Sequence, residues 1–192
     1  MAKLTKKPRA DSHVEVECDA PPANLLPFLG HKNGWVRHHA RECLVKIGES
    51  AVPDLIEALR SKNEDVRWEA AKALGQISDS RAAPALVKAL GDKNFGVRWL
   101  AAEGLIIMGH DAITPLLQEL IEYPDAIWLR QSAHHVLRDL SKKSDYKLVV
   151  PILAAMEGLE PALEVPIAAR NLLDKIAQKK LRGKRQMLSR SS

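Results

Sequence analysis

Apolar residues recur along this chain in pairs of short runs with helical spacing, separated by polar turns. In one pair the first run, 55–59, begins just after Pro53, a residue that the first turn of a helix tolerates. Charged and polar residues at 62–64 predict a turn. The second run has apolar residues on one side of a predicted helix: Val66, Ala70, Ala73, Leu74 and Ile77. The pattern predicts two short helices joined by a tight turn.

This helix pair is repeated about every 31 residues. Prolines at the starts of three first runs are 31 residues apart: Pro53, Pro84 and Pro115. An apolar residue followed by arginine marks each second run: Val36-Arg37, Val66-Arg67, Val97-Arg98 and Leu129-Arg130. Glycines that relieve backbone strain are expected near the ends of second helices: Gly48, Gly75 and Gly109. A period that persists over four copies predicts a stack, because neither helix of a pair buries its apolar stripe alone.

The repeated motif, a first helix followed by D-x-x-x-x-V-R-x-x-A-A-x-A-L-G, resembles the short HEAT-like repeat that is also found in phycobilin lyases. The resemblance covers residues 24–140. It implies an all-α fold, a right-handed α-solenoid of about five stacked antiparallel helix pairs within residues 22–180. The fifth pair is predicted at 148–156 and 165–176, without the Val-Arg signature, as in many terminal copies of repeat proteins.

Basic residues gather at the two ends of the chain. The formal net charge is +5, and ten of the 29 lysines and arginines lie in residues 1–10 and 177–192, which contain no acid. The remaining residues, 11–176, have 19 bases and 24 acids and are mildly acidic. Segments 1–21 and 181–192 combine charge with little apolar periodicity, so both are predicted to be disordered. Weak nucleic-acid binding through these ends would be abolished by high salt.

Composition narrows the class of protein. Aromatic residues make up only 4% of the chain, which argues against a β-sandwich or barrel. No stretch approaches the roughly 20 apolar residues that cross a bilayer, so no membrane association is expected. Cys18 and Cys43 have neither a metal-type spacing nor the density of a disulfide scaffold, so a reducing, cytoplasmic location is expected.

One polar position is the same in all four copies and holds Arg37, Arg67, Arg98 and Arg130. An anion-binding stripe is one interpretation, but a structural role is favoured, because buried arginines usually pair with carboxylates. In HEAT repeats an acid in the turn between the helices commonly meets a basic residue of the second helix. Asp92, six residues before Arg98, fits that role, whereas His31 and Ser61 take its place in earlier copies.

Tryptophan accounts for half of the eight aromatic residues. Trp68 and Trp99 are equivalent in the repeat, and stacking should set them side by side on the inner surface, where indoles are natural anchors for a partner. The alternative is that both rings cover gaps between alanine-lined helices. Four residues after these tryptophans, Lys72 and Glu103 carry opposite charges. A surface of alternating charge favours a peptide of mixed charge over a polyphosphate as the partner. The predicted partner-binding residues are Trp68, Trp99, Lys72, Glu103, His38 and His135.

The chain lacks the sequence signatures of a catalytic or cofactor site. Two adjacent histidines on a helix point about 100° apart, so neither His38-His39 nor His134-His135 can easily hold one ion. No metal site and no cofactor are therefore expected. The leading hypothesis is a non-enzymatic, monomeric protein-binding scaffold. One alternative is a HEAT-repeat alkylpurine DNA glycosylase, suggested by Trp99 and Glu103 one turn apart, although that family uses Asp. The other is a bilin lyase or phycobilisome-associated factor.

Overall fold

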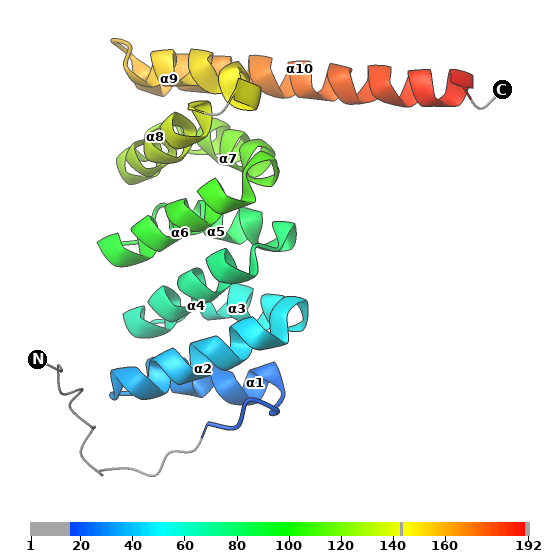
Figure 1. Cartoon of the computed structure of the whole chain (residues 1–192). Coiled ribbons are helices and arrows are strands. Elements are labelled where there is room, and N and C mark those ends of the chain that lie inside the picture. Colours follow the sequence, from blue (N-terminus) through cyan, green and yellow to red (C-terminus); the bar gives the residue numbers. More distant parts are fainter. Residues whose placement is uncertain (1–15, 143, 191–192) are drawn as a thin grey trace, which may run out of the picture.

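The computed structural model describes residues 16–142 and 144–190, and these residues form a stack of helix pairs without a strand (Figure 1). The predicted all-α solenoid is confirmed. Short 3-10 turns precede or extend several first helices: Leu26–Gly30, Gly48–Ala51, Ser80–Ala82 and Ser144–Val149. The pairs are α1 (Pro22–Leu25) with α2 (Gly34–Ile47), α3 (Val52–Ala58) with α4 (Glu64–Ile77), α5 (Ala83–Ala89) with α6 (Phe95–Met108), α7 (His110–Glu122) with α8 (Ile127–Ser141), and α9 (Val150–Met156) with α10 (Pro161–Arg190).

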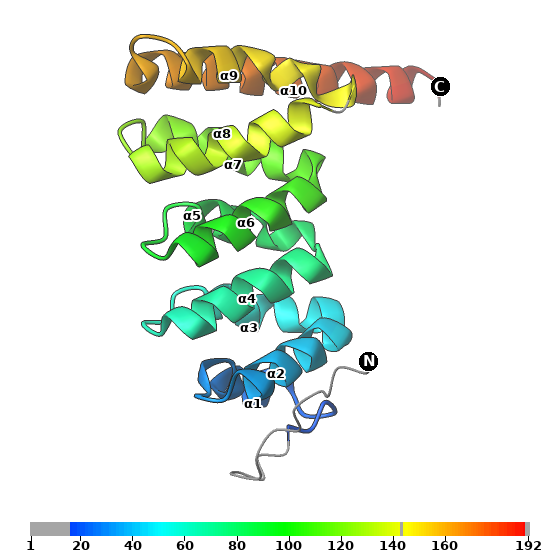
Figure 2. The same ribbon diagram turned by 60° about the vertical axis from the view of Figure 1, so that its left-hand side comes forward.

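The helices lie in two layers, one of first helices and one of second helices (Figures 1 and 2). Second helices stack on second helices, α2 on α4 on α6 on α8, and first helices stack likewise, α5 on α7. The core runs between the layers and is built mainly from leucine and alanine. Fully buried leucines occur in every pair of the four regular copies, among them Leu44, Leu74, Leu105 and Leu137. In the described residues, no helix is both apolar enough and long enough for a membrane span.

Asparagine side chains begin three of the second helices. The Oδ1 atoms of Asn33, Asn63 and Asn94 accept hydrogen bonds from backbone amides two residues later, at 3.0, 2.9 and 2.8 Å. Such N-caps satisfy an amide that has no partner inside the helix. The caps fix where each turn ends, and therefore which side chains stand at the start of each second helix. The fourth copy has Ala126 at this position, without a side-chain cap.

Two glycines allow α4 and α6 to touch through their backbones. A Cβ atom added to Gly75 or to Gly104 would lie 3.1 Å from the Cα atom of the other. Gly48 and Gly109 do end helices, with φ of 73° and 61°. Gly75 also lies near the end of its helix, two residues before Ile77, but its backbone φ is not positive and it does not end α4. Its function is close packing of neighbouring copies, which periodicity along one helix does not reveal.

The fifth pair is reversed relative to the others. Here the first helix of the pair, α9, packs on α8, and the second, α10, packs on α7. The layer of second helices therefore continues into α9, and α10 closes the layer of first helices (Figures 1 and 2). The sequence predicts that two helices follow α8, but their layer depends on which neighbouring surface each covers.

Residues 16–21 were predicted to be disordered, and this prediction is wrong. Val16 is only 8% exposed and belongs to the core, and Cys18 forms a disulfide with Cys43, which is completely buried on α2. The number and spacing of the cysteines did not predict this bond. It attaches the segment before α1 to the first copy. Residues 1–15 lie outside the described part of the chain.

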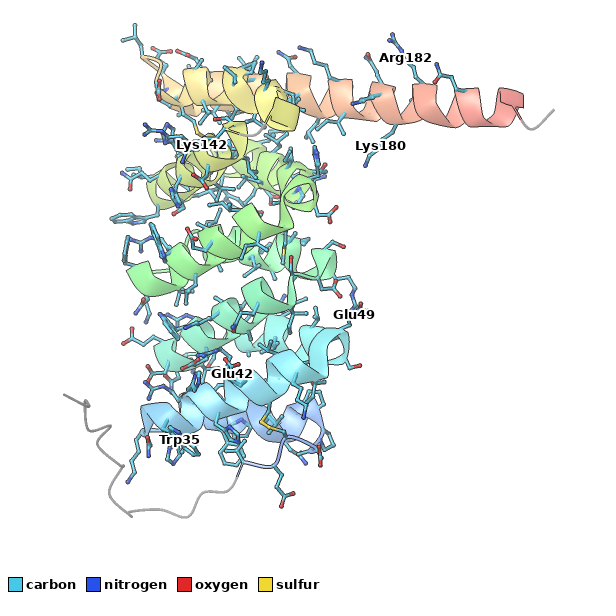
Figure 3. The ribbon with its side chains drawn as sticks, in the orientation of Figure 1. Trp35, Glu42, Glu49, Lys142, Lys180 and Arg182 are labelled. Carbon is cyan, nitrogen blue, oxygen red and sulfur yellow. A yellow bond between two sulfur atoms is a disulfide. The ribbon has the colours of Figure 1, made fainter. Side chains whose placement is uncertain are left out.

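Disorder was also predicted for 181–192, and this is wrong for 181–190, where α10 continues to Arg190. The helix projects beyond the stack and carries the labelled basic side chains Lys180 and Arg182 (Figures 1 and 3). Lysine, arginine, glutamine and leucine are good helix formers, and the packed first half of α10 supplies the costly nucleus. The segment from 181 onward has no apolar stripe because this part of α10 projects away from the core. Residues 191–192 lie outside the described part.

Candidate functional site

The four arginines of the repeat hold the turns between helices. Each guanidinium donates through Nη1 to the backbone carbonyl six residues earlier. The distances are 2.8 Å from Arg37 to His31, 2.9 Å from Arg67 to Ser61 and 2.8 Å from Arg98 to Asp92, and Arg130 makes the same contact with Pro124. The arginine position thus recurs because every turn has a carbonyl to satisfy.

Asp92 pairs with Arg67 of the preceding copy. Arg67 donates from Nε to Oδ2 at 2.6 Å and from Nη2 to Oδ1 at 3.0 Å, and both side chains are about nine-tenths buried. Burial alone would raise the pKa of the Asp92 carboxyl. Hydrogen bonds from Arg67 and from the amide of Asn94, with the charges of Arg67 and Lys93, lower it below its usual range. This bidentate pair joins α4 to the next turn.

A second buried ion pair joins α2 to α4, and the repeat pattern did not predict it. Arg41 and Glu69 are each only 4% exposed, and Arg41 Nη1 lies 2.5 Å from Glu69 Oε2. Arg41 Nη2 also contacts His38 Nδ1 at 2.5 Å. The sequence did contain a sign of this pair, because Arg41 occupies a position that is alanine in the next two copies, at Ala71 and Ala102.

The structure brings three of the predicted partner-binding residues together between α2 and α4. His38, Trp68 and Lys72 line a hollow of about 440 Å³ whose other residues are mostly charged. Lys72 Nζ lies 5.0 Å from the centre of the Trp68 ring. The indole is half-buried and lies over the first turn of α6, where a Cβ on Gly96 would come within 3.0 Å of it. Trp68 therefore covers the gap between copies.

The other three predicted residues lie between α6 and α8. The rings of Trp99 and His135 stack with centres 5.0 Å apart, and His135 Nε2 lies 3.3 Å from Glu103 Oε1. Trp99 and His135 line a pocket of about 350 Å³ together with Phe95, Arg98, Ala102, Trp128, Gln131 and Ser132. Five of the six predicted residues thus line two separate hollows on the second-helix layer, and Glu103 pairs with His135 beside the second hollow.

Exposed aromatic rings dominate this second hollow, which we call the aromatic pocket. Phe95 is 67% exposed, Trp128 56% and Trp99 47%. Sequence reasoning did not select Phe95 or Trp128 as partner-binding residues. The signal was present, because the corresponding residues of the second copy are Glu64 and Asp65, and aromatic rings replace those charges at the start of a helix.

Trp68 and Trp99 are equivalent in sequence but differ in exposure because of one residue in the following copy. Trp68 lies over Gly96, which has no side chain. The residue at that position in the fourth copy is Trp128, which has a large ring where Gly96 has no side chain. Trp99 stacks on His135. The same repeat position therefore holds a tryptophan that covers the gap between copies, Trp68, and an exposed tryptophan that can anchor a partner, Trp99.

Arg98 provides the positive charge of the aromatic pocket. Its guanidinium carbon lies 5.6 Å from the Phe95 ring centre and 4.5 Å from the Trp128 ring centre. Pro124 takes the place that Asp92 has in the preceding turn, and no carboxylate of the described residues forms an ion pair with Arg98. The cation is therefore held by its turn carbonyl and by two π faces.

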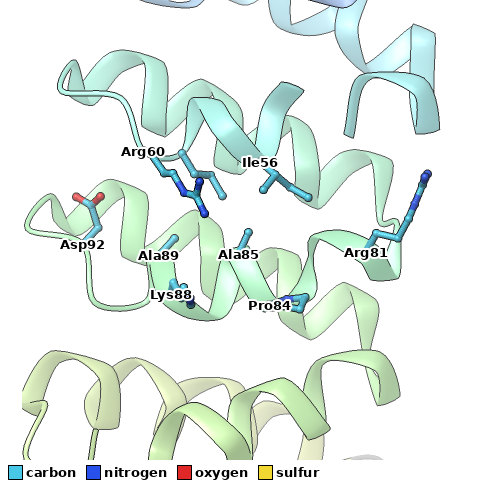
Figure 4. A pocket seen from close by; sticks show the side chains of 9 residues that line it. Ile56, Arg60, Arg81, Pro84, Ala85, Lys88, Ala89 and Asp92 are labelled. Atoms are coloured by element: carbon cyan, nitrogen blue, oxygen red, sulfur yellow. The ribbon is translucent and has the colours of Figure 1, made fainter. Parts of the chain in front are cut away.

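A third hollow lies on the opposite layer, between α3 and α5 (Figure 4). Its volume is about 310 Å³, and its lining combines Ile56 and Pro84 with basic side chains. Two of these bases already have acidic partners: Arg60 lies 2.9 Å from Glu57, and Arg81 lies 2.5 Å from Asp79. The hollow has no aromatic ring, so the aromatic pocket is the better candidate for binding.

Comparison with known families gives the same assignment as the fold. The family model described as HEAT repeats matches residues 52–138, and the one described as PBS lyase HEAT-like repeat matches residues 36–61. A search of curated proteins gives no significant match. The matched residues contain the arginine column, the turns of the second to fourth pairs and most of the helices that line both hollows. Residues 36–138 of the chain are therefore HEAT-like repeats.

Proposed function

We propose that this chain is a non-enzymatic scaffold that binds a peptide segment of another protein in the aromatic pocket. The observation that carries the proposal is the exposed cluster of Phe95, Trp99 and Trp128 around Arg98. Aromatic and arginine side chains are the residues that contribute most to binding at protein interfaces. Because the pocket is made by helices, its shape is fixed before the partner arrives, and little ordering is needed on binding.

The chemistry of the pocket favours a segment with an apolar side chain beside a carboxylate. The apolar side chain would lie between Trp99 and Trp128, and the carboxylate would pair with Arg98, which lacks an acidic partner in the described residues. Such charge-assisted bonds are stronger than neutral ones. His135 is already engaged with Glu103, so it contributes its ring face to Trp99.

DNA is less well matched to this surface than a peptide. The hollow between α2 and α4 sets Arg37, Arg41 and Lys72 against Glu64, Asp65 and Glu69. A DNA-binding groove is expected to carry an excess of lysine and arginine, because phosphate neutralisation supplies most of the affinity. Glu103, the carboxylate that suggested a glycosylase, pairs with His135.

The test is selection from a random peptide library on the immobilised full chain, followed by affinity measurements on synthetic peptides. We expect enrichment of sequences in which an apolar residue adjoins Asp or Glu. Trp99→Ala and Trp128→Ala should each weaken binding about tenfold or more, since both truncate pocket anchors. Replacing the acid of the peptide by its amide should cost about tenfold as well.

Trp35→Ala is the matched control. Trp35 is 57% exposed and occupies in α2 the position of Trp128 in α8, but it stacks on His39, away from the aromatic pocket. Its replacement should leave the affinity within about a factor of two, as for most residues outside a hot spot. No enrichment, or enriched peptides that bind the Trp99 and Trp128 variants as well as the native chain, would contradict the proposal. Binding of duplex DNA that is lost in the same two variants would favour the DNA alternative.

A further inference from the structure

The segment before α1 brings a second cysteine to a helix that already carries a cysteine and a histidine. His39 and Cys43 are four residues apart on α2 and therefore lie on one face of the helix. Cys18 reaches the same place from the preceding segment. One ring nitrogen of His39 and the two Sγ atoms all lie within 4.8 Å of one another.

We propose that these three residues form a Zn²⁺ site when the Cys18–Cys43 disulfide is reduced. Thiolate and imidazole are preferred ligands of Zn²⁺, and its bonds to S and N are about 2.3 and 2.0 Å long. Two sulfur ligands at the corners of a tetrahedron are then about 3.8 Å apart. Reduced sulfurs must separate to roughly that distance in any case, so the metal fits with a small movement of Cys18.

The surroundings suit a bound cation at the edge of the core. Cys43 is completely buried, whereas Cys18 and His39 are half-buried, which places the site between the core and the surface. The Trp35 ring stacks on His39 with centres 5.3 Å apart and limits how the imidazole turns. Neither ring nitrogen of His39 makes a hydrogen bond within the described part of the chain, so one is available to a metal. The fourth position would hold water.

No metal was expected from the sequence, because the histidines stand in adjacent pairs and the two cysteines lack a metal-type spacing. The pairs do diverge, with His38 facing Arg41 while His39 faces the cysteines. In a reducing compartment the metal would do what the disulfide does in this structure, attaching the segment around Val16 to the first helix pair. This inference is independent of the aromatic pocket and of the function proposed for it.

The experiment is a Co²⁺ titration of the full chain after anaerobic reduction with a phosphine. The phosphine supplies two electrons, and water supplies the oxygen of the phosphine oxide and the two protons of the resulting thiols. We expect one Co²⁺ per chain, with the thiolate-to-cobalt absorption of a tetrahedral site, displaced by Zn²⁺. His39→Gln should weaken binding by about 10- to 100-fold, and Cys18→Ser by at least about as much.

Two controls keep the result interpretable. The native chain with its disulfide intact should bind no Co²⁺, and this comparison needs no substitution. His38→Gln, which alters the neighbouring histidine on another face of α2, should bind Co²⁺ like the native chain. The proposal would be overturned if the reduced chain bound no Co²⁺, or if His39→Gln bound it as tightly as the native chain.

Discussion

Replacing Asp92 by alanine is expected to lower the free energy of unfolding by about 3–5 kcal/mol. The reason is the position of Arg67, whose side chain is only 7% exposed and loses its bidentate carboxylate. Its turn carbonyl would remain, but a buried guanidinium that keeps only neutral partners is strongly destabilising. Urea denaturation followed by circular dichroism measures the loss.

An exposed ion pair provides the control for Asp92. Glu57 on α3 and Arg60, two residues after the end of α3, lie 2.9 Å apart, and both side chains are more than two-thirds exposed. Glu57→Ala should change stability by less than about 1 kcal/mol, as is usual for surface pairs. Equal losses in the two variants would show that burial of the Arg67 pair is not what matters.

The pair of Arg67 and Asp92 should also make the free energy of unfolding depend on pH, which can be measured on the same variants. The pKa of Asp92 is lower in the folded chain than its unfolded value of about 3.9. Its contribution is therefore complete above the unfolded pKa and is lost as the pH falls through the folded pKa. The stability difference between the native chain and Asp92→Ala should be constant near neutral pH and shrink in acid. A difference that grew in acid would contradict this assignment.

Replacing Gly104 by leucine is expected to destabilise the chain by about 3 kcal/mol. A Cβ at this position would lie 3.1 Å from the Cα of Gly75 and 3.2 Å from Leu86 Cδ1, and leucine adds three more carbons. The Gly75 backbone cannot turn aside as a flexible side chain would, so α4 and α6 must separate. Thermal and urea unfolding measure the effect.

Gly183 is the matched glycine for this prediction. It also lies inside a helix, on the projecting part of α10, but a Cβ there would meet no atom within 4 Å. Gly183→Leu should therefore leave global stability unchanged or raise it slightly, since leucine is the better helix former. A similar loss in both variants would indicate that the substitution is harmful by itself, without helix separation.

Most of the fold could be predicted because its signals are local. Apolar spacing within each run, a proline before it and a repeated Val-Arg pair are all properties of neighbouring residues. The layers occupied by α9 and α10 could not be predicted, since they depend on which exposed surface each helix covers. The projecting half of α10 could not be predicted from an apolar stripe, because it has none and its residues form a helix through their propensity.

The candidate site was only partly predictable, because equivalent positions do not have equivalent neighbours. Trp68 and Trp99 share a position, but their surroundings are set by Gly96 and Trp128 of the following copies. Gly96 lies 28 residues after Trp68, and Trp128 lies 29 residues after Trp99. Comparing each tryptophan with that later residue would have distinguished the covered ring from the exposed one. The buried pair of Arg41 and Glu69 was missed because it breaks the repeat instead of following it.

Among the described residues no carboxylate forms an ion pair with Arg98, and this bears on how the stack comes apart. Repeat proteins unfold as units whose size is set by nearest-neighbour coupling. Buried ion pairs couple the first three copies, at Arg41 with Glu69 and Arg67 with Asp92. The junction between α6 and α8 has the half-exposed pair of Glu103 and His135 in their place. The coupling by ion pairs along the four regular copies is therefore least buried under the aromatic pocket, and a partner bound there would join the third and fourth copies more firmly.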